Sequence, residues 1–300
     1  MPLKTRPLTD TFGQEVLDVD LSDLDDATFD EIYKLWQQDP VLLFRRQSFS
    51  ERQQVEYSKR FGELDILVRD DMISPQHPEI IYITALRRPD GTPLGGLGTQ
   101  EIYWHHDQIY RQRPASGSVF YAVEMPEGEG QTSFCNTSLG LERMPDNLRK
   151  QLEGRRATAK YGLKAESTTQ RDLGKDPEAM KKINEKTPPA THDIVLENPA
   201  TGQKSFYLDP NKTLRIEGVS EQESKELIDT VYQFMLQQDE LIYSHNWRNG
   251  DVVMWDNARV WHRREQFDAT KPRFARRTTI FLRPDDFAVP EPDLARGAAE

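Results

Sequence analysis

Three stretches of the chain repeat apolar residues at the spacing of an amphipathic helix. The first covers residues 25–38. Its apolar positions are Phe29, Ile32, Leu35 and Trp36. The second, residues 51–61, begins after Ser50, which forms with Gln53 the sequence signature of a capping box. The third begins after Ser220, and its apolar face consists of Leu227, Ile228, Val231, Phe234 and Met235.

Between and after these helices, the chain contains short runs rich in β-branched and aromatic residues, separated by turns of Pro, Gly and Asn. The runs are residues 41–44, 80–84, 117–123, 205–208, 251–256 and 278–282. Short strands with long excursions are typical of antiparallel double sheets. We therefore predict a mostly-β fold with surrounding helices and a double-stranded β-helix (jelly-roll) core, and a single domain over residues 1–300.

One segment does not fit either pattern. Residues 164–189 are highly charged and have little apolar periodicity. A segment of this length without a regular pattern is either a mobile lid over a site or a solvated surface loop. We keep it as a candidate lid insertion.

Composition narrows the class of protein. The 300 residues are 36% hydrophobic and 9% aromatic, which is enough for a substantial core. The formal net charge of −11 disfavours nucleic acid and anionic membranes as partners. One cysteine, no apolar signal core and no run of membrane-spanning length predict a cytoplasmic protein. A homo-oligomer stays open.

The motif Trp104-His105-His106-Asp107 is the first candidate for chemistry. Residues two apart on a strand point to the same face, so His105 and Asp107 can aim at one point while His106 faces away. One imidazole and one carboxylate, joined by a second histidine, form the facial triad of non-haem Fe(II) oxygenases. By itself this triplet is better explained as a surface pair.

A second constellation lies near the C-terminus. An apolar strand leads into Trp255-Asp256-Asn257, and His262 is expected just beyond its end. Arg273 and Arg277 follow four positions apart, so they can lie on one face of a strand. Two arginines on a core strand are costly unless an anion meets them. A dicarboxylate is such an anion, because a guanidinium binds a carboxylate through two parallel hydrogen bonds.

Together these residues resemble the TauD/TfdA-like family of Fe(II)/2-oxoglutarate dioxygenases, the family of taurine dioxygenase and 2,4-dichlorophenoxyacetate dioxygenase. The resemblance extends from about residue 8 to residue 282. The matching stretches are Phe61-Gly62-Glu63-Leu64, Trp104-His105-His106-Asp107, Gly130-Gln131-Thr132, Trp255-Asp256-Asn257 with His262, and the pair Arg273 and Arg277. The long separation of Asp107 and His262 also fits the family.

The resemblance implies that His105, Asp107 and His262 hold Fe(II), with 2-oxoglutarate and O₂ as co-substrates. A small organic substrate would be oxidised at a C–H bond while 2-oxoglutarate is converted to succinate and CO₂. Hydroxylation is the default outcome, and desaturation or cyclisation stays open. The carboxylate ligand Asp107 is present, which excludes the halogenating variant of this chemistry.

Other roles are also implied by the resemblance. Thr132 and Arg273 would bind the distal carboxylate of 2-oxoglutarate, and Arg277 would lie near the substrate's anionic group or the keto-acid end. The family's taurine-contacting positions correspond here to Leu67, Asp70 and Glu101, which argues against taurine. Candidate substrate-binding residues are Tyr110, Glu101, Gln108 and Arg69, of which Tyr110 is favoured. The substrate is expected to carry a carboxylate.

Two other classes of protein compete with this interpretation. A Zn²⁺-dependent hydrolase could use the same two histidines and aspartate, but it does not account for Thr132 and the arginine pair. A non-catalytic jelly-roll binding protein with a relic metal site is the other alternative.

Overall fold

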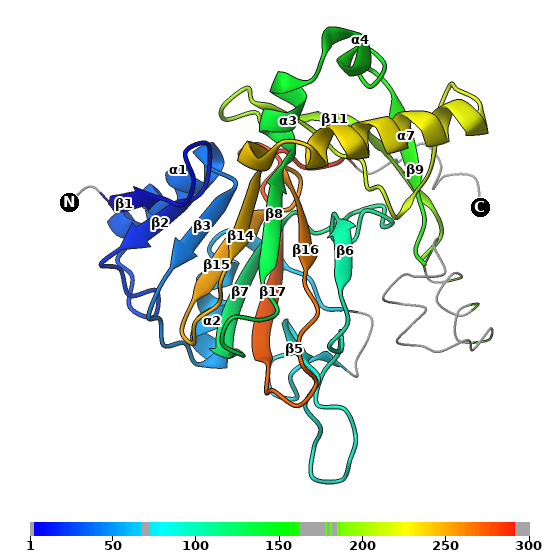
Figure 1. Cartoon of the computed structure of the whole chain (residues 1–300). Helices are drawn as coiled ribbons and strands as arrows, with labels where there is room; N and C mark the ends of the chain where they lie inside the picture. The colour runs from blue at the N-terminus through cyan, green and yellow to red at the C-terminus, as the bar shows by residue number, and fades with distance from the viewer. Residues whose placement is uncertain are drawn as a thin grey trace.

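Two facing β-sheets form the centre of the structure (Figure 1). The computed structural model describes residues 3–67, 72–162 and 187–291, together with Glu178, Lys181 and Glu185. In hydrogen-bonded order, the larger sheet contains β1 (Lys4–Pro7), β2 (Gln14–Leu17), β3 (Val41–Phe44), β15 (Val252–Asp256), β7 (Gly117–Glu124), β17 (Phe274–Leu282) and β4 (Gly62–Leu64). A further strand, β5 (Ile80–Thr84), pairs with the first half of β17.

The smaller sheet carries the residues of interest. Its order is β14 (Ile242–His245), β8 (Thr132–Asn136), β16 (Val260–Arg264) and β6 (Ile102–His105). All its pairs are antiparallel. The predicted jelly-roll core is thus confirmed, although the strand expected at residues 278–282 begins earlier, at Phe274, and the run at 205–208 is a strand only to Phe206.

The alternation of side chains along the larger sheet separates two apolar layers. In β15, Val252 and Met254 pack with the helices that cover the outer face, whereas Val253 and Trp255 point toward the smaller sheet. Phe134 of the smaller sheet meets Trp255 there, with ring centroids 5.6 Å apart. A strand buried on both faces reads as a continuous apolar run, as residues 252–255 do.

Helices cover both outer faces. They are α1 (Asp26–Gln38), α2 (Glu51–Lys59), α3 (Thr137–Arg143), α4 (Asp146–Arg149), α7 (Glu221–Leu236) and the 3₁₀ turn η2 (Asp239–Leu241). The predicted capping boxes are present: Ser50 and Gln53 exchange hydrogen bonds at the start of α2, and Ser220 and Glu223 do so at the start of α7. These reciprocal bonds satisfy backbone N–H groups that the first turn leaves free.

The outer face of the smaller sheet packs against α3, α4 and α7, which gather at one end of the molecule (Figure 1). Trp261 of β16 and Val231 of α7 belong to the same buried cluster. Two small sheets complete this layer: β10 (Ala190–Asp193), β9 (Arg156–Ala159) and β13 (Thr213–Ile216) form one, and β11 (Val195–Glu197) with β12 (Lys204–Phe206) forms the other. The candidate lid, residues 164–189, lies almost wholly outside the described residues.

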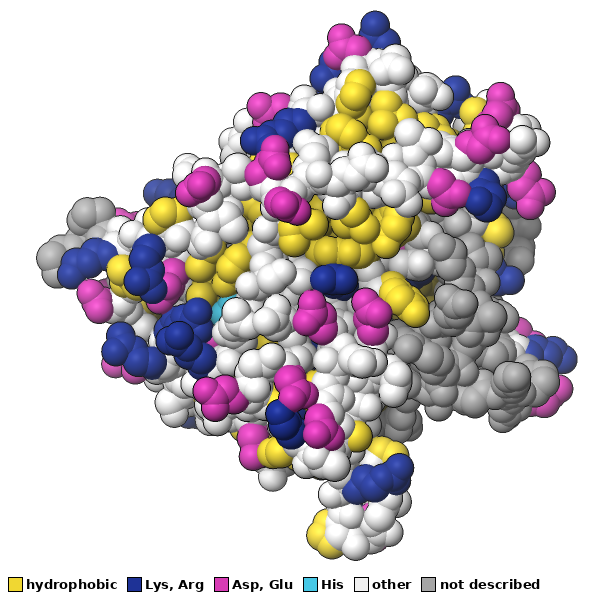
Figure 2. Space-filling model, in the orientation of Figure 1, with side chains coloured by type: hydrophobic (Ala, Val, Ile, Leu, Met, Phe, Trp, Pro, Cys, Tyr) yellow, Lys and Arg dark blue, Asp and Glu magenta, His cyan; other side chains and the backbone are white. Residues whose placement is uncertain are grey.

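The surface gives two further facts. Within the described part of the chain, a search for a helix that could cross a membrane finds none. On the face seen in Figure 2, acidic and basic side chains are interspersed, so the described side chains of that face form no continuous basic patch.

Candidate metal and co-substrate site

Two histidines and one aspartate meet between the strands of the smaller sheet. His105 ends β6, and His262 lies directly opposite it in the middle of β16. One donor atom from each of these histidines and from Asp107 lies within 4.8 Å of the others. The Nε2 atoms of His105 and His262 lie 3.5 and 3.4 Å from the two carboxylate oxygens of Asp107. The predicted triad is therefore brought together.

One detail of that prediction is wrong: Asp107 is not on the strand with His105 but in the turn that follows it. His262 lies beyond the end of β15, as expected, and within the next strand, β16, which follows after a tight turn at residues 257–259. The face argument holds for His106, which is buried on the other side against Tyr207.

The two imidazoles of the triad are oriented and set for metal binding in different ways. The Nδ1 of His105 lies 2.8 Å from the carbonyl oxygen of Tyr103. A carbonyl only accepts, so Nδ1 carries the proton and the lone pair of Nε2 is left for the site. Burial, followed by the neighbouring His105, lowers the pKa of His262 to about 4. Neutral imidazole is the form that binds a metal ion.

Arg277 forms an ion pair with Asp107 and keeps it ionised. Its Nη1 donates to Oδ2 of Asp107 at 2.8 Å. Burial would raise the pKa of the Asp107 carboxyl, but the Arg277 guanidinium and the two imidazoles hold it well below its usual value. Asp107 is therefore an anion, which is the hard oxygen ligand that Fe(II) accepts beside two imidazoles. The donor set fits a ferrous ion.

Asn257 clamps the turn that presents Asp107. Its side-chain oxygen accepts the backbone N–H of Asp107 at 2.8 Å, and its amide nitrogen donates to the carbonyl oxygens of Asp107 and Ala115 at 3.0 and 3.2 Å. Its own carbonyl lies 2.6 Å from Nδ1 of His106. These bonds fix the backbone on both sides of Asp107, a support on which ligand orientation depends.

The loop between β12 and β13 holds the same motif from the other side. The buried carboxylate of Asp209 accepts the backbone N–H of His106 at 2.9 Å. Lys212 donates to the His106 carbonyl at 2.7 Å and lies 3.2 Å from Asp209. Asn211 donates to the carbonyl of Trp104 at 2.6 Å. Sequence reasoning missed this loop, because nothing in the spacing of residues 209–212 links it to residues 104–106.

A cationic cradle lies beside the triad, on the inner side of β16 and β17. The buried guanidiniums of Arg264 and Arg273 both lie over the ring of Phe267, at 5.3 and 5.5 Å. Burial, and then the charge of Arg264, lower the pKa of Arg273 to about 9. Nε and Nη1 of Arg273 are buried and find no hydrogen-bond partner among the described residues. Donors of Arg273 without a partner among these residues, next to the charge of Arg264, are suited to the distal carboxylate of a dicarboxylate.

Gly130 and Thr132 border this cradle. Gly130 has a φ of +64°, and a Cβ added there would lie 3.3 Å from Nε of Arg273 and 3.4 Å from Phe267. A side chain would therefore be strained and would crowd the guanidinium. Thr132 is buried at the start of β8, where it lies opposite Arg264 in the strand register. Arg273 and Arg277 do share one face, since Ala275 between them points into the layer between the sheets.

The residues predicted to bind substrate lie in different parts of the structure. Tyr110 is half-buried with its ring centroid 4.5 Å from that of Tyr161, and burial, Tyr161 and Asp107 raise its pKa. Gln108 is placed inward by a φ of 54° and bonds to Asp65, Arg111 and Ala115, so its amide is occupied within the chain. This placement contradicts a pocket position for Gln108.

Glu101 is also misplaced by the prediction. Its carboxylate lies 3.8 Å from Arg263, whose guanidinium lies 5.2 Å from the ring centroid of Trp104. Trp104 packs in the helix-covered cluster, so Glu101 is on the outer side of the sheet, away from His105. Arg69 lies outside the described residues.

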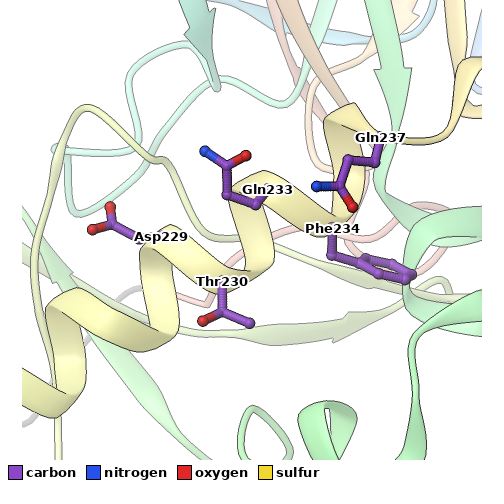
Figure 3. Close-up of a pocket in the computed structure, with 5 residues that line it drawn as sticks. All are labelled: Asp229, Thr230, Gln233, Phe234 and Gln237. Atoms are coloured by element: carbon purple, nitrogen blue, oxygen red, sulfur yellow. The ribbon is translucent and has the colours of Figure 1, made fainter.

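A shallow groove on α7 is separate from this site. Figure 3 shows it lined by Asp229, Thr230, Gln233, Phe234 and Gln237. It shares no residue with the triad or the cradle and contains one carboxylate and no histidine. We assign no chemistry to it.

A jelly roll that presents two histidines and one carboxylate beside a cradle for a dicarboxylate defines a class, the mononuclear non-haem Fe(II) oxygenases. Comparison with known proteins agrees. The family described as "Taurine catabolism dioxygenase TauD, TfdA family" matches residues 4–279. The chain belongs to this family, whose enzymes are oxidoreductases dependent on Fe(II), 2-oxoglutarate and O₂.

Individual relatives are similar over nearly their whole length. The chain is 31% identical over 296 residues to the pentalenolactone F synthase of Streptomyces avermitilis, covering 95% of each protein. It is 29% identical to the alpha-ketoglutarate-dependent 2,4-dichlorophenoxyacetate dioxygenase of Cupriavidus pinatubonensis, covering 93% of this chain and 98% of that protein. The crystal structure of a taurine dioxygenase from Burkholderia xenovorans superposes with a TM-score of 0.76 at 25% identity, covering 97% and 95% of the two chains.

Proposed function

We propose that this dioxygenase oxidises a C–H bond of a small organic substrate that carries a carboxylate, with hydroxylation as the outcome. The observation that carries the proposal is Arg277. Its guanidinium is largely buried beside the metal ligands, and its Nε finds no hydrogen-bond partner among the described residues. A donor in this position suits an anionic group of a molecule lying next to the metal.

The relatives support the same substrate class. Two of them are named for acting on 2,4-dichlorophenoxyacetate and (S)-phenoxypropionate, each a carboxylate on an apolar body. Tyr110 and Tyr161 provide an aromatic pair close to Asp107. We infer that the carboxylate faces Arg277 and the apolar body faces Tyr110.

Each residue then has a defined task. His105, Asp107 and His262 hold the iron, and Thr132 and Arg273 bind the distal carboxylate of 2-oxoglutarate. Bound Fe(II) with 2-oxoglutarate and O₂ supplies the oxidising power, and 2-oxoglutarate leaves as succinate and CO₂.

The protein's own contribution to the reaction is positioning and exclusion of water. Arg277 binds the substrate carboxylate while it keeps Asp107 ionised. The tyrosine pair excludes water from the reacting C–H bond.

The metal triad is tested by substitution. His105→Ala and Asp107→Ala should abolish both succinate release and the visible absorption that Fe(II) and 2-oxoglutarate give anaerobically. His77→Ala, outside the site, is the matched control and should retain both. A zinc hydrolase would give no such absorption, and a relic site would take up no O₂ with any substrate. Full activity in either triad variant would remove the assignment.

The substrate class is tested with a panel of aryloxy acids, alicyclic acids, amino acids and sulfonates, scored by succinate release and product mass. For the best substrate, Arg277→Gln should raise KM by about 10- to 100-fold, since a charge-assisted hydrogen bond contributes about 1.5–3 kcal/mol. The anaerobic absorption serves as the control for intact 2-oxoglutarate binding. An unchanged KM with that absorption intact contradicts the role of Arg277.

A further inference from the structure

The hydroxyl of Thr132 receives a hydrogen bond from an indole. Trp247 is buried in the segment between β14 and β15, and its Nε1 donates to Oγ1 of Thr132 at 3.0 Å. An indole N–H only donates, whereas a threonine hydroxyl has one proton and two acceptor lone pairs. The indole therefore occupies an acceptor site of Thr132 and leaves its proton available.

Among the hydrogen bonds of the described residues, the Thr132 proton has no acceptor. Buried hydroxyl groups are normally satisfied. Thr132 borders the cradle in which Nε and Nη1 of Arg273 also lack partners. A hydroxyl proton and a guanidinium that both lack acceptors are suited to one anion between them.

The indole itself is held rigidly. One side packs against Phe120, with ring centroids 4.7 Å apart, and the edge-to-face contact with His245 is 4.4 Å. His245 is fixed in turn by Tyr243 at 2.8 Å and by Asp251 at 3.1 Å. The position of the Trp247 N–H, and hence of the Thr132 hydroxyl, is therefore set before any ligand binds.

We propose that Trp247 is a positioning residue for the co-substrate: its N–H orients the Thr132 hydroxyl so that the hydroxyl donates to the distal carboxylate of 2-oxoglutarate. This inference rests on the proposed function, in which Thr132 and Arg273 bind that carboxylate. Trp247 does not touch the ligand and acts only through Thr132. Removing the Trp247 N–H should therefore weaken binding of the distal carboxylate. Binding of the keto-acid end of the ligand and of the metal should stay unchanged.

The test is Trp247→Phe, which removes the N–H and keeps an aromatic ring against Phe120. Dissociation constants are measured anaerobically with Fe(II) for 2-oxoglutarate and for 2-oxopentanoate, which has a methyl group in place of the distal carboxylate. The variant should bind 2-oxoglutarate about five- to tenfold more weakly, the value of one neutral hydrogen bond, and 2-oxopentanoate as wild type does. Trp36→Phe is the matched control, because Trp36 is buried in the helix layer and its Nε1 has no partner among the described residues.

A double-mutant cycle shows whether the effect passes through Thr132. Thr132→Val should weaken 2-oxoglutarate binding, and adding Trp247→Phe should change it no further; Thr132→Ser should restore it. Equal weakening for both keto acids, no weakening, or additive effects of the two substitutions would overturn the inference while the proposed function stands. Absence of 2-oxoglutarate binding to wild type with Fe(II) would instead overturn the proposed function, and the inference with it.

Discussion

Replacing Arg273 by methionine should make the ligand-free protein more stable and abolish its response to 2-oxoglutarate. Arg273 is 2% exposed, and Nε and Nη1 of its guanidinium find no hydrogen-bond partner among the described residues. Its pKa falls from 12.5 to about 9. At about 1.4 kcal/mol for each pKa unit, holding the charge in the fold costs about 5 kcal/mol.

The methionine variant avoids this cost but loses favourable contacts of the guanidinium, which offset part of the stabilisation. The guanidinium lies 5.8 and 5.5 Å from the ring centroids of Phe120 and Phe267. Each cation–π contact contributes about 0.5–1 kcal/mol, and repacking a side chain of different shape costs up to about 1.5 kcal/mol. We expect the free energy of unfolding to rise by about 1.5–4 kcal/mol.

The assay is urea denaturation of the metal-free protein at neutral pH, repeated with Mn²⁺ and 2-oxoglutarate. A ligand present at 100 times its dissociation constant stabilises wild type by about 2.7 kcal/mol, and the variant should gain nothing from 2-oxoglutarate beyond the effect of Mn²⁺ alone. Arg273→Lys is the control that keeps a buried charge and should not be stabilised. A methionine variant less stable than wild type, or one still stabilised by 2-oxoglutarate, would refute the reasoning.

Three further outcomes are expected. Asn257→Ala leaves buried backbone groups at Asp107 unpaired, at about 1–3 kcal/mol each, so the free energy of unfolding measured in urea should fall by about 3–5 kcal/mol. Mn²⁺ affinity measured by calorimetry should fall as well, and unchanged values for both would contradict the role of Asn257. Burial lowers the pKa of His262 to about 4 and that of His106 to about 3, so below about pH 6.5 the unfolded chain binds more protons than the folded protein. The free energy of unfolding of the metal-free protein should therefore fall by about 1.4 kcal/mol per such histidine for each pH unit below that value. A urea midpoint that stays the same from pH 7 to 5.5 would contradict this. Tyr110→Ala should raise the substrate KM and leave the dissociation constant of 2-oxoglutarate within twofold, and the reverse pattern would place Tyr110 elsewhere.

Much of this architecture could be predicted from local pattern. The capping boxes at Ser50 and Ser220 and the apolar run at 252–255 depend on neighbouring residues alone, so the sequence specifies them. The convergence of His105, Asp107 and His262 was predicted from spacing and family resemblance. These parts of the prediction agree with the structure.

The errors have a different origin. Gln108 was predicted to bind substrate, but it has a φ of 54° and its side-chain amide donates to Asp65. Glu101 was placed there by alignment, yet its partner Arg263 lies on the outer side of the sheet. The support from Asp209 was missed altogether. All three depend on contacts between residues far apart in the chain, which no periodicity records.

The pairing of Arg277 with Asp107 affects the stability of the fold when the metal ion is lost. Loss of a divalent ion can leave its carboxylate ligand as an unpaired buried anion, which destabilises the fold. Here the counter-charge is already bonded to that carboxylate at 2.8 Å, and the lowered pKa of His262 keeps that imidazole neutral. After loss of the ion Asp107 therefore keeps a bonded counter-charge, so we expect the metal-free protein to unfold in urea at nearly the same midpoint as the metal-bound protein once the binding energy of the ion is subtracted.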